Sequence, residues 1–160
     1  TGIMLAGEGI PIDAVVADFI SGAAELISQD NDDDHWDVIE GQGSLIHPGY
    51  SGVSLGLLHG SQADAIVLCH DAGRELVSGW EHYTLPSIRE AIDQHVIMGS
   101  RTNPDIRCVG ISVNTSSLPA NERVNYLARL SEKFRLPCVD PMIDGCGPIV
   151  AYIKQLYPEA

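Results

Sequence analysis

The stretch IRCVGISVNTSSL, residues 106–118, decides the fold class of this chain of 160 residues. It begins as an apolar run typical of a buried strand and ends in polar residues, and the run PANERVNYLARLSEKF at 119–134 follows with helical spacing. A strand that is apolar along its whole length is typical of a parallel sheet, because both of its faces must be covered. The stretch therefore predicts an α/β protein.

The same alternation continues on both sides of this stretch. Further strand-like runs occur near 36–39, 65–69 and 137–139. Helical spacing or helix-entry signals occur at 11–27, 51–62, 85–99 and 147–157. Alternating strands and helices predict a mainly parallel sheet with helices on both faces, in a single domain over residues 1–160.

The apolar positions also predict which helix faces are buried. In the helix predicted at 119–134, with Ser117 as a possible cap, the inward face holds Val124, Leu127, Leu130 and Phe134. In the helix predicted at 85–99 the inward face holds Ile88, Ala91, Ile92, His95 and Val96. On that face His95 is expected at the edge of the core with one hydrogen bond.

Charge and hydropathy exclude two classes of partner. The chain carries 22 acidic and 9 basic residues, which gives a formal net charge of −13. Excess negative charge repels phosphate backbones and anionic lipid surfaces, so we expect neither nucleic acid nor a membrane as partner. No apolar run approaches the ~20 residues needed to cross a bilayer, and the start of the chain lacks a signal-peptide pattern.

Part of the acidity is local. The run DNDDD at 30–34 is most simply a solvated loop, with a metal site as the alternative. Asp140 and Asp144 flank a turn, and in a chain so rich in acid a structural role is favoured for both.

The cysteines show no CxxC pair. They are Cys69, Cys108, Cys138 and Cys146, and the first three lie in or at the end of strand-like runs. This usage predicts buried, reduced thiols of a cytoplasmic protein. Cys69 with the adjacent His70 is a poor nucleophile and base, because neighbouring strand residues point to opposite faces.

Polar segments follow all the predicted strands. They read EGQGSLIHPGY at 40–50, CHDAGR at 69–74, NTSS at 114–117 and DPMIDG at 140–145. In a parallel sheet the carboxyl ends of the strands meet at one edge, and ligands bind beyond that edge. We therefore expect the functional site there.

Glu40 ends its predicted strand, where nucleotide-binding sheets place a carboxylate that holds Mg²⁺ directly or through water. Gly41 and Gly43 would allow close backbone approach to a ligand. The alternative is a carboxylate that caps a turn. The combination of an acid, an amide and two glycines in EGQG favours the ligand site.

Histidines near this carboxylate are candidate general bases, because their usual pKa of about 6.5 lies close to neutral pH. His47, followed by Tyr50, is the strongest candidate. His59 and His70 are weaker ones, with loop or helix-surface roles as the alternative.

Two further segments offer ligand contacts. Arg74 lies just past a predicted strand end, where it could bind a carboxylate or phosphate bidentately or make a surface ion pair. Asn114, Thr115 and Ser116 offer donors and acceptors at another strand end, or they cap the helix that follows.

Three stretches carry a family resemblance: TGIMLAGEGIPIDAVVADFISGAAE, DVIEGQGSLIHPGYSGVSLGLLHGSQADAIVLCH and VGISVNTS. They resemble the C-terminal part of the D-glutamate N-acetyltransferase-like family, long described as of unknown function. The similarity runs along essentially the whole chain, and EGQGSLIHPGYSG is its most specific portion. The resemblance implies a P-loop NTPase-like fold similar to dethiobiotin synthetase, in which the corresponding strand ends in a VEGAGG-like segment with a magnesium-binding glutamate.

The same resemblance implies residue roles. It places Glu40 on the ligand side with Gly41, Gln42 and Gly43 beside it, and it matches Asn114 to a position that commonly faces a nucleotide base. No GxxxxGK[ST] loop occurs in this sequence, whereas the family has a P-loop-like segment upstream. The resemblance therefore implies the C-terminal portion of a longer protein, without the first strand and phosphate loop.

Acyl transfer is the leading functional hypothesis: the domain helps to bind acetyl-CoA and places the amine of a D-amino acid against the thioester. Glu40 or His47 would act as base, and backbone donors of the glycine loop would stabilise the oxyanion. Thr1 could serve as an N-terminal nucleophile, although trimming or proteolysis is the plainer account of this start. The expected ligand-binding residues are Gly41, Gln42, Gly43, Ser44, Tyr50, Arg74 and Asn114, with Mg²⁺ possible at Glu40.

The expected partners are the missing N-terminal portion, a small-molecule substrate and further copies in a homo-oligomer. One alternative is an ATP- and Mg²⁺-dependent phosphoryl-transfer or ligase reaction resembling that of dethiobiotin synthetase. A non-catalytic assembly domain is another. A dinucleotide-dependent dehydrogenase is least favoured, because no GxGxxG follows any strand.

Overall fold

The structure is a computed structural model that describes residues 7, 9–32 and 34–158. The chain divides into two compact units. The helical unit comprises the described residues of 7–64 and 93–106, and the sheet unit comprises 65–92 and 107–158. Thr1 lies outside the described residues. No helix in the described ranges is long and apolar enough to cross a membrane.

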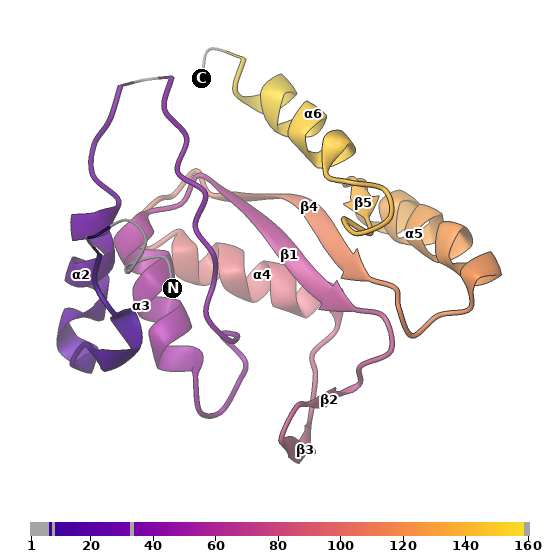
Figure 1. Ribbon diagram of the computed structural model, residues 1–160, viewed down its shortest axis with the longest axis horizontal. Helices are drawn as coiled ribbons and strands as arrows, with labels where there is room; N and C mark the ends of the chain where they lie inside the picture. Colours follow the sequence, from indigo (N-terminus) through magenta and orange to yellow (C-terminus); the bar gives the residue numbers. More distant parts are fainter. Residues whose placement is uncertain (1–6, 8, 33, 159–160) are drawn as a thin grey trace. The chain divides into compact units, whose positions relative to one another are not determined.

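A parallel sheet forms the centre of the sheet unit. Its strands are β1 (Ala65–Asp71), β4 (Arg107–Asn114) and β5 (Cys138–Val139), in the order β1-β4-β5. β1 and β4 run side by side in the same direction, and their carboxyl ends are level because Asp71 pairs with Asn114 (Figure 1). The predicted α/β fold with a mainly parallel sheet is confirmed.

The core of this unit forms around β4, whose Val109, Ile111 and Val113 have no exposed surface. The helices α5 (Ala120–Phe134) and α6 (Gly147–Leu156) pack against the sheet. Gly110 lets α6 approach closely, because a Cβ at this position would lie 2.8 Å from Cγ1 of Ile149. The apolar run at the start of the stretch 106–118 is therefore buried on both faces of the sheet, as predicted.

One predicted inward position of α5 is wrong, since Val124 is 75% exposed. Leu127 and Leu130 are half-buried and Phe134 is buried, as predicted. The first turn of the helix is half-buried through Arg123 instead. An arginine can bury its aliphatic stem. A prediction based on apolar residues alone does not include such a position.

A hairpin that the sequence did not predict follows β1. Its strands are β2 (Leu76–Val77) and β3 (Trp80–Thr84), which pair antiparallel. The turn between them uses Gly79 at φ 76°. All of β3 is exposed, so the hairpin lacks the alternation of apolar and polar residues that marks a half-buried strand.

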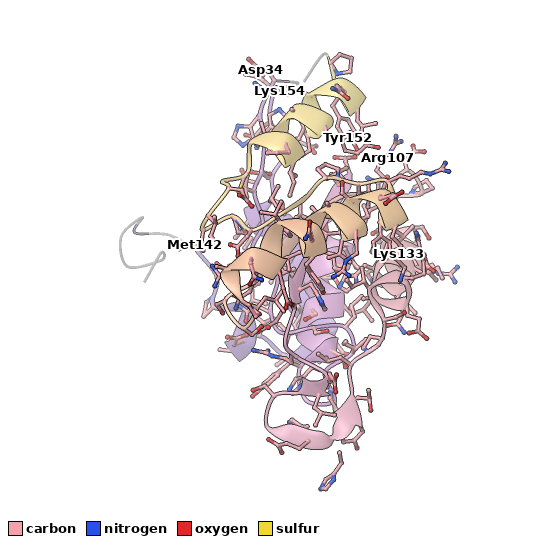
Figure 2. The ribbon with its side chains drawn as sticks, turned by 90° about the vertical axis from the view of Figure 1, so that its right-hand side faces the viewer. Asp34, Arg107, Lys133, Met142, Tyr152 and Lys154 are labelled. Carbon is pink, nitrogen blue, oxygen red and sulfur yellow. The ribbon has the colours of Figure 1, made fainter. Side chains whose placement is uncertain are left out.

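After the hairpin, the predicted helix is confirmed as α4 (Ile88–Gly99). Its predicted inward face is also confirmed, because Ile92 is buried and the other members of that face are half-buried. Met142, on the loop after β5, is 91% exposed (Figure 2).

The helical unit contains η1 (Ile12–Ala14), η2 (Ala17–Phe19), α2 (Ile20–Ile27) and α3 (Ser51–Ser61). α2 and α3 lie against each other (Figure 1). Glycines of α3 allow this, because a Cβ on Gly60 would lie 2.7 Å from Cβ of Ala24. The helix predicted at 51–62 is thus confirmed.

A continuous helix over 11–27 is wrong. Two short 3₁₀ turns precede α2, separated by Val15 at ψ 138° and Val16 at ψ 136°. β-branched side chains are stiff and prefer extended backbone, so two adjacent valines interrupt the helix although the apolar spacing continues.

The strand predicted at 36–39 is also wrong. Residues 35–42 have no regular secondary structure and belong to neither sheet. Val38 is 96% exposed. A strand needs a neighbour that takes its backbone hydrogen bonds, and an apolar run does not show whether one is present. Glu40 therefore lies in a segment without regular secondary structure and does not end a strand.

The cysteines carry free thiols, but the prediction that they are buried is wrong for Cys69 and Cys146, which are exposed. Cys69 shares its face of β1 with the exposed Val67, whereas Cys108 and Cys138 are half-buried. Burial raises the pKa of Cys108, and burial followed by the nearby Cys108 thiol raises the pKa of Cys138 to about 11. Both of these thiols stay protonated at neutral pH.

Candidate functional site

A tightly built loop, residues 40–50, leads into α3 in the helical unit; we call it the glycine loop. Gly43 has φ 47°, and a Cβ there would lie 2.8 Å from Cβ of Tyr50. The Tyr50 ring lies 4.5 Å from the His47 ring, centroid to centroid. Ser54 on α3 donates a hydrogen bond from its hydroxyl to the carbonyl oxygen of Gln42. Contacts within the loop and with α3 thus fix its conformation.

His47 is held in one tautomer by its own loop. Its Nδ1 accepts a hydrogen bond of 3.0 Å from the backbone N–H of Gly49, so the proton of the neutral ring is on Nε2. Its carbonyl oxygen accepts from the N–H groups of Tyr50 and Ser51. In this arrangement Nδ1 accepts from the loop and Nε2 is the donor.

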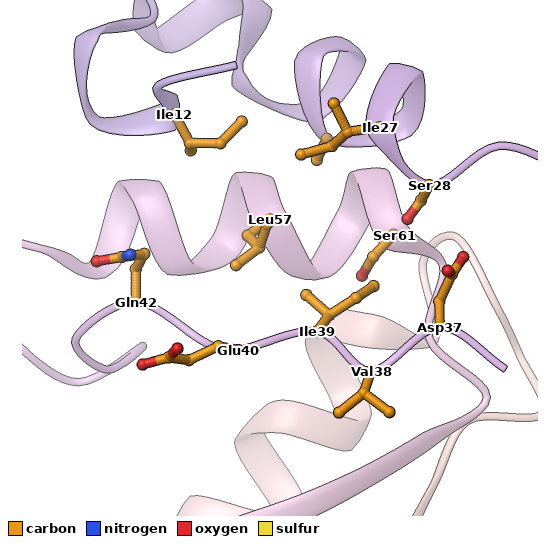
Figure 3. A pocket seen from close by; sticks show the side chains of 11 residues that line it. Ile12, Ile27, Ser28, Asp37, Val38, Ile39, Glu40, Gln42, Leu57 and Ser61 are labelled. Carbon is orange, nitrogen blue, oxygen red and sulfur yellow. The ribbon is translucent and has the colours of Figure 1, made fainter. Parts of the chain in front are cut away.

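A cavity of about 320 Å³ lies next to the glycine loop, within the helical unit. Its lining residues are Ile12, Ala24, Ile27, Ser28, Asp37, Val38, Ile39, Glu40, Gln42, Leu57 and Ser61. Figure 3 shows Ile39 pointing toward α3 and Leu57, with Glu40 and Gln42 at one end of the cavity and Asp37 at the other. The cavity combines apolar walls with two carboxylates.

The residues present do not form a Mg²⁺ site by themselves. Among the described residues, no group of three or more His, Cys, Asp or Glu side chains could hold a metal ion. Mg²⁺ is usually held by about one or two carboxylates and completes its shell with water and substrate phosphates. Glu40 fits only such a single-carboxylate role.

In the sheet unit the loops that follow β1 and β4 are joined. The N–H of Ala72 donates to the carbonyl oxygen of Asn114 over 3.1 Å. Gly73 is packed against Ser117, because a Cβ on Gly73 would lie 2.7 Å from Cβ of Ser117. Asn114 accepts at Oδ1 from the N–H of Ser116 over 3.0 Å, so its amide presents Nδ2 as a donor.

Asp140 joins the loops after β4 and β5. It is 4% exposed, and its Oδ2 accepts from the N–H of Thr115 over 3.0 Å and from its hydroxyl over 2.5 Å. Its Oδ1 accepts from the N–H of Met142. The hydrogen bond from the Thr115 hydroxyl, more than any other contact, lowers the pKa of Asp140. Asp144 accepts from the N–H of Asp140, so both carboxylates make contacts within the fold.

His70 and His59 make contacts to neighbouring elements. His70 Nε2 lies 3.2 Å from the hydroxyl of Tyr126 on α5. Burial lowers the pKa of His70, and the charge of Asp71 opposes this shift in part. His59 Nε2 lies 3.0 Å from the carbonyl oxygen of Met98, so this nitrogen is the donor.

The structure thus places the predicted site residues in two groups, which we describe separately. One group is the glycine loop, with Glu40, Gly41, Gln42, Gly43, Ser44, His47 and Tyr50. The other comprises Arg74, which follows β1, and Asn114, which ends the neighbouring strand β4. Asp71, which was not among the predicted site residues, accepts from both the N–H of Gly73 and the guanidinium of Arg74. An acid two residues before a glycine is a turn signal that could have found it.

A parallel sheet whose strands lead into polar loops defines an α/β domain, and in such domains ligands usually bind beyond the carboxyl ends of the strands. The chain belongs to the DUF1611 family: the domain described as "Domain of unknown function (DUF1611_C) P-loop domain" matches residues 1–150. The family resemblance of the sequence is therefore confirmed.

Two curated relatives are each named D-glutamate N-acetyltransferase. The one from Pseudoalteromonas sp is 53% identical over 150 residues, and the one from Tritonibacter scottomollicae is 49% identical over 150 residues. Each match covers 94% of this chain and 45% of the relative, so the chain spans about half the length of the relatives it matches. Their names support membership of an enzyme family.

A solved structure has the same fold. It is a crystal structure of a DUF1611 family protein from Anabaena variabilis, with a TM-score of 0.85 and 34% sequence identity. The match covers 96% of this chain and 45% of that chain. The α/β architecture thus agrees with that of a solved member of the family.

Proposed function

We propose that this chain is part of an enzyme that transfers an acetyl group from acetyl-CoA to the amine of a D-amino acid such as D-glutamate. The observation that carries the proposal is the identity of 53% and 49% to two relatives named D-glutamate N-acetyltransferase. The cavity beside the glycine loop supports it, because it offers a carboxylate next to apolar walls.

The reaction requires a base, since the amine of an amino acid is an ammonium ion at neutral pH. After loss of a proton, its nitrogen attacks the thioester carbonyl carbon. The new N–C bond forms, the C–S bond breaks, and the CoA thiolate leaves and takes up a proton. Glu40 lines the cavity and is exposed, so a substrate could reach its carboxylate. In this proposal Glu40 accepts the ammonium proton.

The oxyanion that forms during the attack needs hydrogen-bond donors. The tautomer fixed by Gly49 makes His47 Nε2 a donor, which suits this role better than that of a base. Gly43 and Tyr50 hold the loop in shape beside it. The expected ligand contacts of Gly41, Gln42 and Ser44 belong to the same proposal.

The nucleotide end of acetyl-CoA is the part that a P-loop domain would bind, and Asn114 presents an amide donor at a strand end. The proposal further includes assembly into a homo-oligomer. It also includes that other parts of the intact protein complete the site. Thr1 as a nucleophile remains a separate hypothesis.

The test uses the intact protein that contains this chain. It is incubated with acetyl-CoA and D-glutamate, and release of the CoA thiol is followed together with the mass of the product. We expect thiol release that depends on D-glutamate and a product heavier by one acetyl group. Thiol release without an acetylated amino acid would refute the proposal.

An ATP- and Mg²⁺-dependent phosphoryl-transfer or ligase reaction is the second candidate, favoured by the description of the family as a P-loop domain. Calorimetric titration of the intact protein with ATP and Mg²⁺, and separately with acetyl-CoA, distinguishes the two. Binding of ATP with Mg²⁺ and no binding of acetyl-CoA would favour the second candidate.

A further inference from the structure

We propose that a second copy of this chain docks on the sheet unit, over a cavity beside β5, in a two-fold symmetric dimer. The inference rests on the homo-oligomer included in the proposed function and adds the surface through which the copies meet. It follows from three exposed apolar side chains, which we call the Met142 patch: Val124, Met142 and Ile143. Every residue of this surface belongs to the sheet unit.

The cavity has a volume of about 210 Å³ and is formed by α5 and the loop after β5. Its apolar walls are Ala120, Val124, Leu127 and Ile143. Arg123 and Asp144 also line it. At roughly 30 Å³ per water molecule in the liquid, the volume equals that of about seven waters. An apolar side chain of a partner therefore fits inside.

The Met142 patch adds exposed apolar surface to this cavity. Val124 is 75% exposed, Met142 is 91% exposed and Ile143 is 58% exposed. Val124 and Ile143 also line the cavity, and Met142 directly precedes Ile143, so the patch and the cavity form one surface. Single apolar side chains are normal on a protein surface, but a group of them around an apolar cavity is typical of a protein–protein contact.

The turn that carries Met142 is held by hydrogen bonds to Asp140. The N–H of Met142 donates to Oδ1 of Asp140 over 3.1 Å. The N–H groups of Ile143 and Asp144 donate to the carbonyl oxygen of Asp140 over 3.1 Å and 2.7 Å. Asp140 in turn accepts from the N–H of Thr115. The backbone of the patch is therefore in place before a partner arrives, which lowers the entropy lost on docking.

The position of the patch next to the cavity favours a second copy as the partner. In a two-fold symmetric contact the same surface faces itself, so a group on one copy meets a neighbouring group on the other. Met142 of each copy can then enter the cavity of the other, where its unbranched side chain adapts to the walls. A small ligand inside the cavity would leave Met142 exposed, because this residue does not line the cavity.

The charges of this surface complement each other in the same way. Arg123 donates from Nε to the carbonyl oxygen of Leu118 over 3.2 Å, and no other hydrogen bond joins its side chain to the described residues. Asp144 accepts at Oδ2 from the N–H of Asp140, and its Oδ1 has no donor among those residues. Across a two-fold axis the guanidinium of each copy meets the carboxylate of the other. This local attraction opposes the repulsion between two chains of net charge −13.

Sedimentation equilibrium of the intact protein tests this surface. In Met142→Glu we expect the dissociation constant of the dimer to rise by roughly 100-fold or more, because a charge would enter an apolar cavity in both copies. Val150→Glu is the matched control. It makes a similar change at an apolar side chain of α6 that is 45% exposed, and it should leave the dissociation constant unchanged. An unchanged dissociation constant in Met142→Glu overturns the inference, as does a wild-type protein that stays monomeric.

A mixing experiment tests the symmetry of the contact. Arg123→Glu and Asp144→Arg each place like charges opposite each other in their own dimers, so each dissociation constant should rise by roughly 10–100-fold. In a mixed dimer of the two variants both contacts join opposite charges again, and mixing should restore association. Weakened dimers that mixing does not restore overturn the inference, because the partner surface would then be a different one.

Other occupants of the patch give different results. If Met142→Glu weakens the binding of acetyl-CoA in calorimetry but leaves the oligomer unchanged, the patch binds a ligand and the inference is overturned. If Met142→Glu loses the circular dichroism signal of the fold, another part of the same chain covers Met142, which also overturns it. Sedimentation does not use the reaction. A monomer that acetylates D-glutamate therefore overturns this inference alone, whereas a dimer without acetyl transfer refutes only the proposed activity.

Discussion

Replacement of Asp140 by alanine tests how the loops at the carboxyl edge of the sheet are held. Three donors point at this carboxylate: the N–H and the hydroxyl of Thr115, and the N–H of Met142. Thr115 has no exposed surface, so both of its donors would be left without a partner. Met142 is 91% exposed, and its N–H can turn to water.

The expected loss follows from this difference. An orphaned buried donor costs about 1–3 kcal/mol, so the two donors of Thr115 predict that Asp140→Ala lowers the free energy of unfolding by about 2–6 kcal/mol. Asp144→Ala is the matched control. Asp144 is exposed and only accepts from one N–H, so this change should cost about 1 kcal/mol or less. Urea denaturation of the intact protein measures both.

The same contact predicts a pH dependence. The folded-state pKa of Asp140 is lowered, so its charged form stabilises the fold above the usual pKa of about 3.9. This contribution is lost as the pH falls through the lower folded-state pKa. The difference in unfolding free energy between wild type and Asp140→Asn should therefore shrink in acid. A loss below 1 kcal/mol for Asp140→Ala at pH 7, or a constant difference between pH 7 and pH 2, would refute the reasoning.

Two predictions concern the glycine loop. Glu40→Gln should lower kcat/KM for acetyl transfer by about 10²–10⁴-fold while the melting temperature stays within a few degrees, because the amide is nearly isosteric. An unchanged kcat/KM with a lowered melting temperature would instead make Glu40 structural. Gly43→Ala should cost about 1–3 kcal/mol in urea denaturation, since a Cβ would lie 2.8 Å from Cβ of Tyr50 at φ 47°. Gly41→Ala is its control, because nothing lies within 4 Å of a Cβ there.

The sequence predicted correctly those helices and strands whose apolar residues are buried in the core. Val109, Ile111 and Val113 are fully buried, and their apolar run identified β4. An apolar run did not predict the structure around Val38, where no neighbouring strand pairs with it. Apolar spacing also failed at Val15 and Val16, where two stiff side chains interrupt the predicted helix. Burial determines where apolar residues occur in a sequence. Whether such a segment becomes a helix or a strand also depends on strand pairing and on the backbone preference of its residues.

The sequence identified candidate site residues by their type and position, but it did not predict the contacts that those residues make. Arg74 could be identified as a candidate because it follows a strand. The hydrogen bond that its guanidinium donates to Asp71 depends on a turn whose conformation cannot be read from the sequence. Thr115 and Asp140 are 25 residues apart in sequence, and only the pairing of β4 with β5 brings their loops together. The tautomer of His47 likewise depends on one backbone N–H of its own loop.

The position of β1 at the side of the sheet affects how this chain behaves when produced on its own. One flank of the strand pairs with β4, and no described strand pairs with the other. Residues 65–71, AIVLCHD, contain neither proline nor lysine, which would discourage the addition of another strand. Unpaired backbone groups and the exposed Val67 then offer a template for strand addition. The isolated chain is therefore expected to self-associate, and light scattering that shows a stable monomer would contradict this.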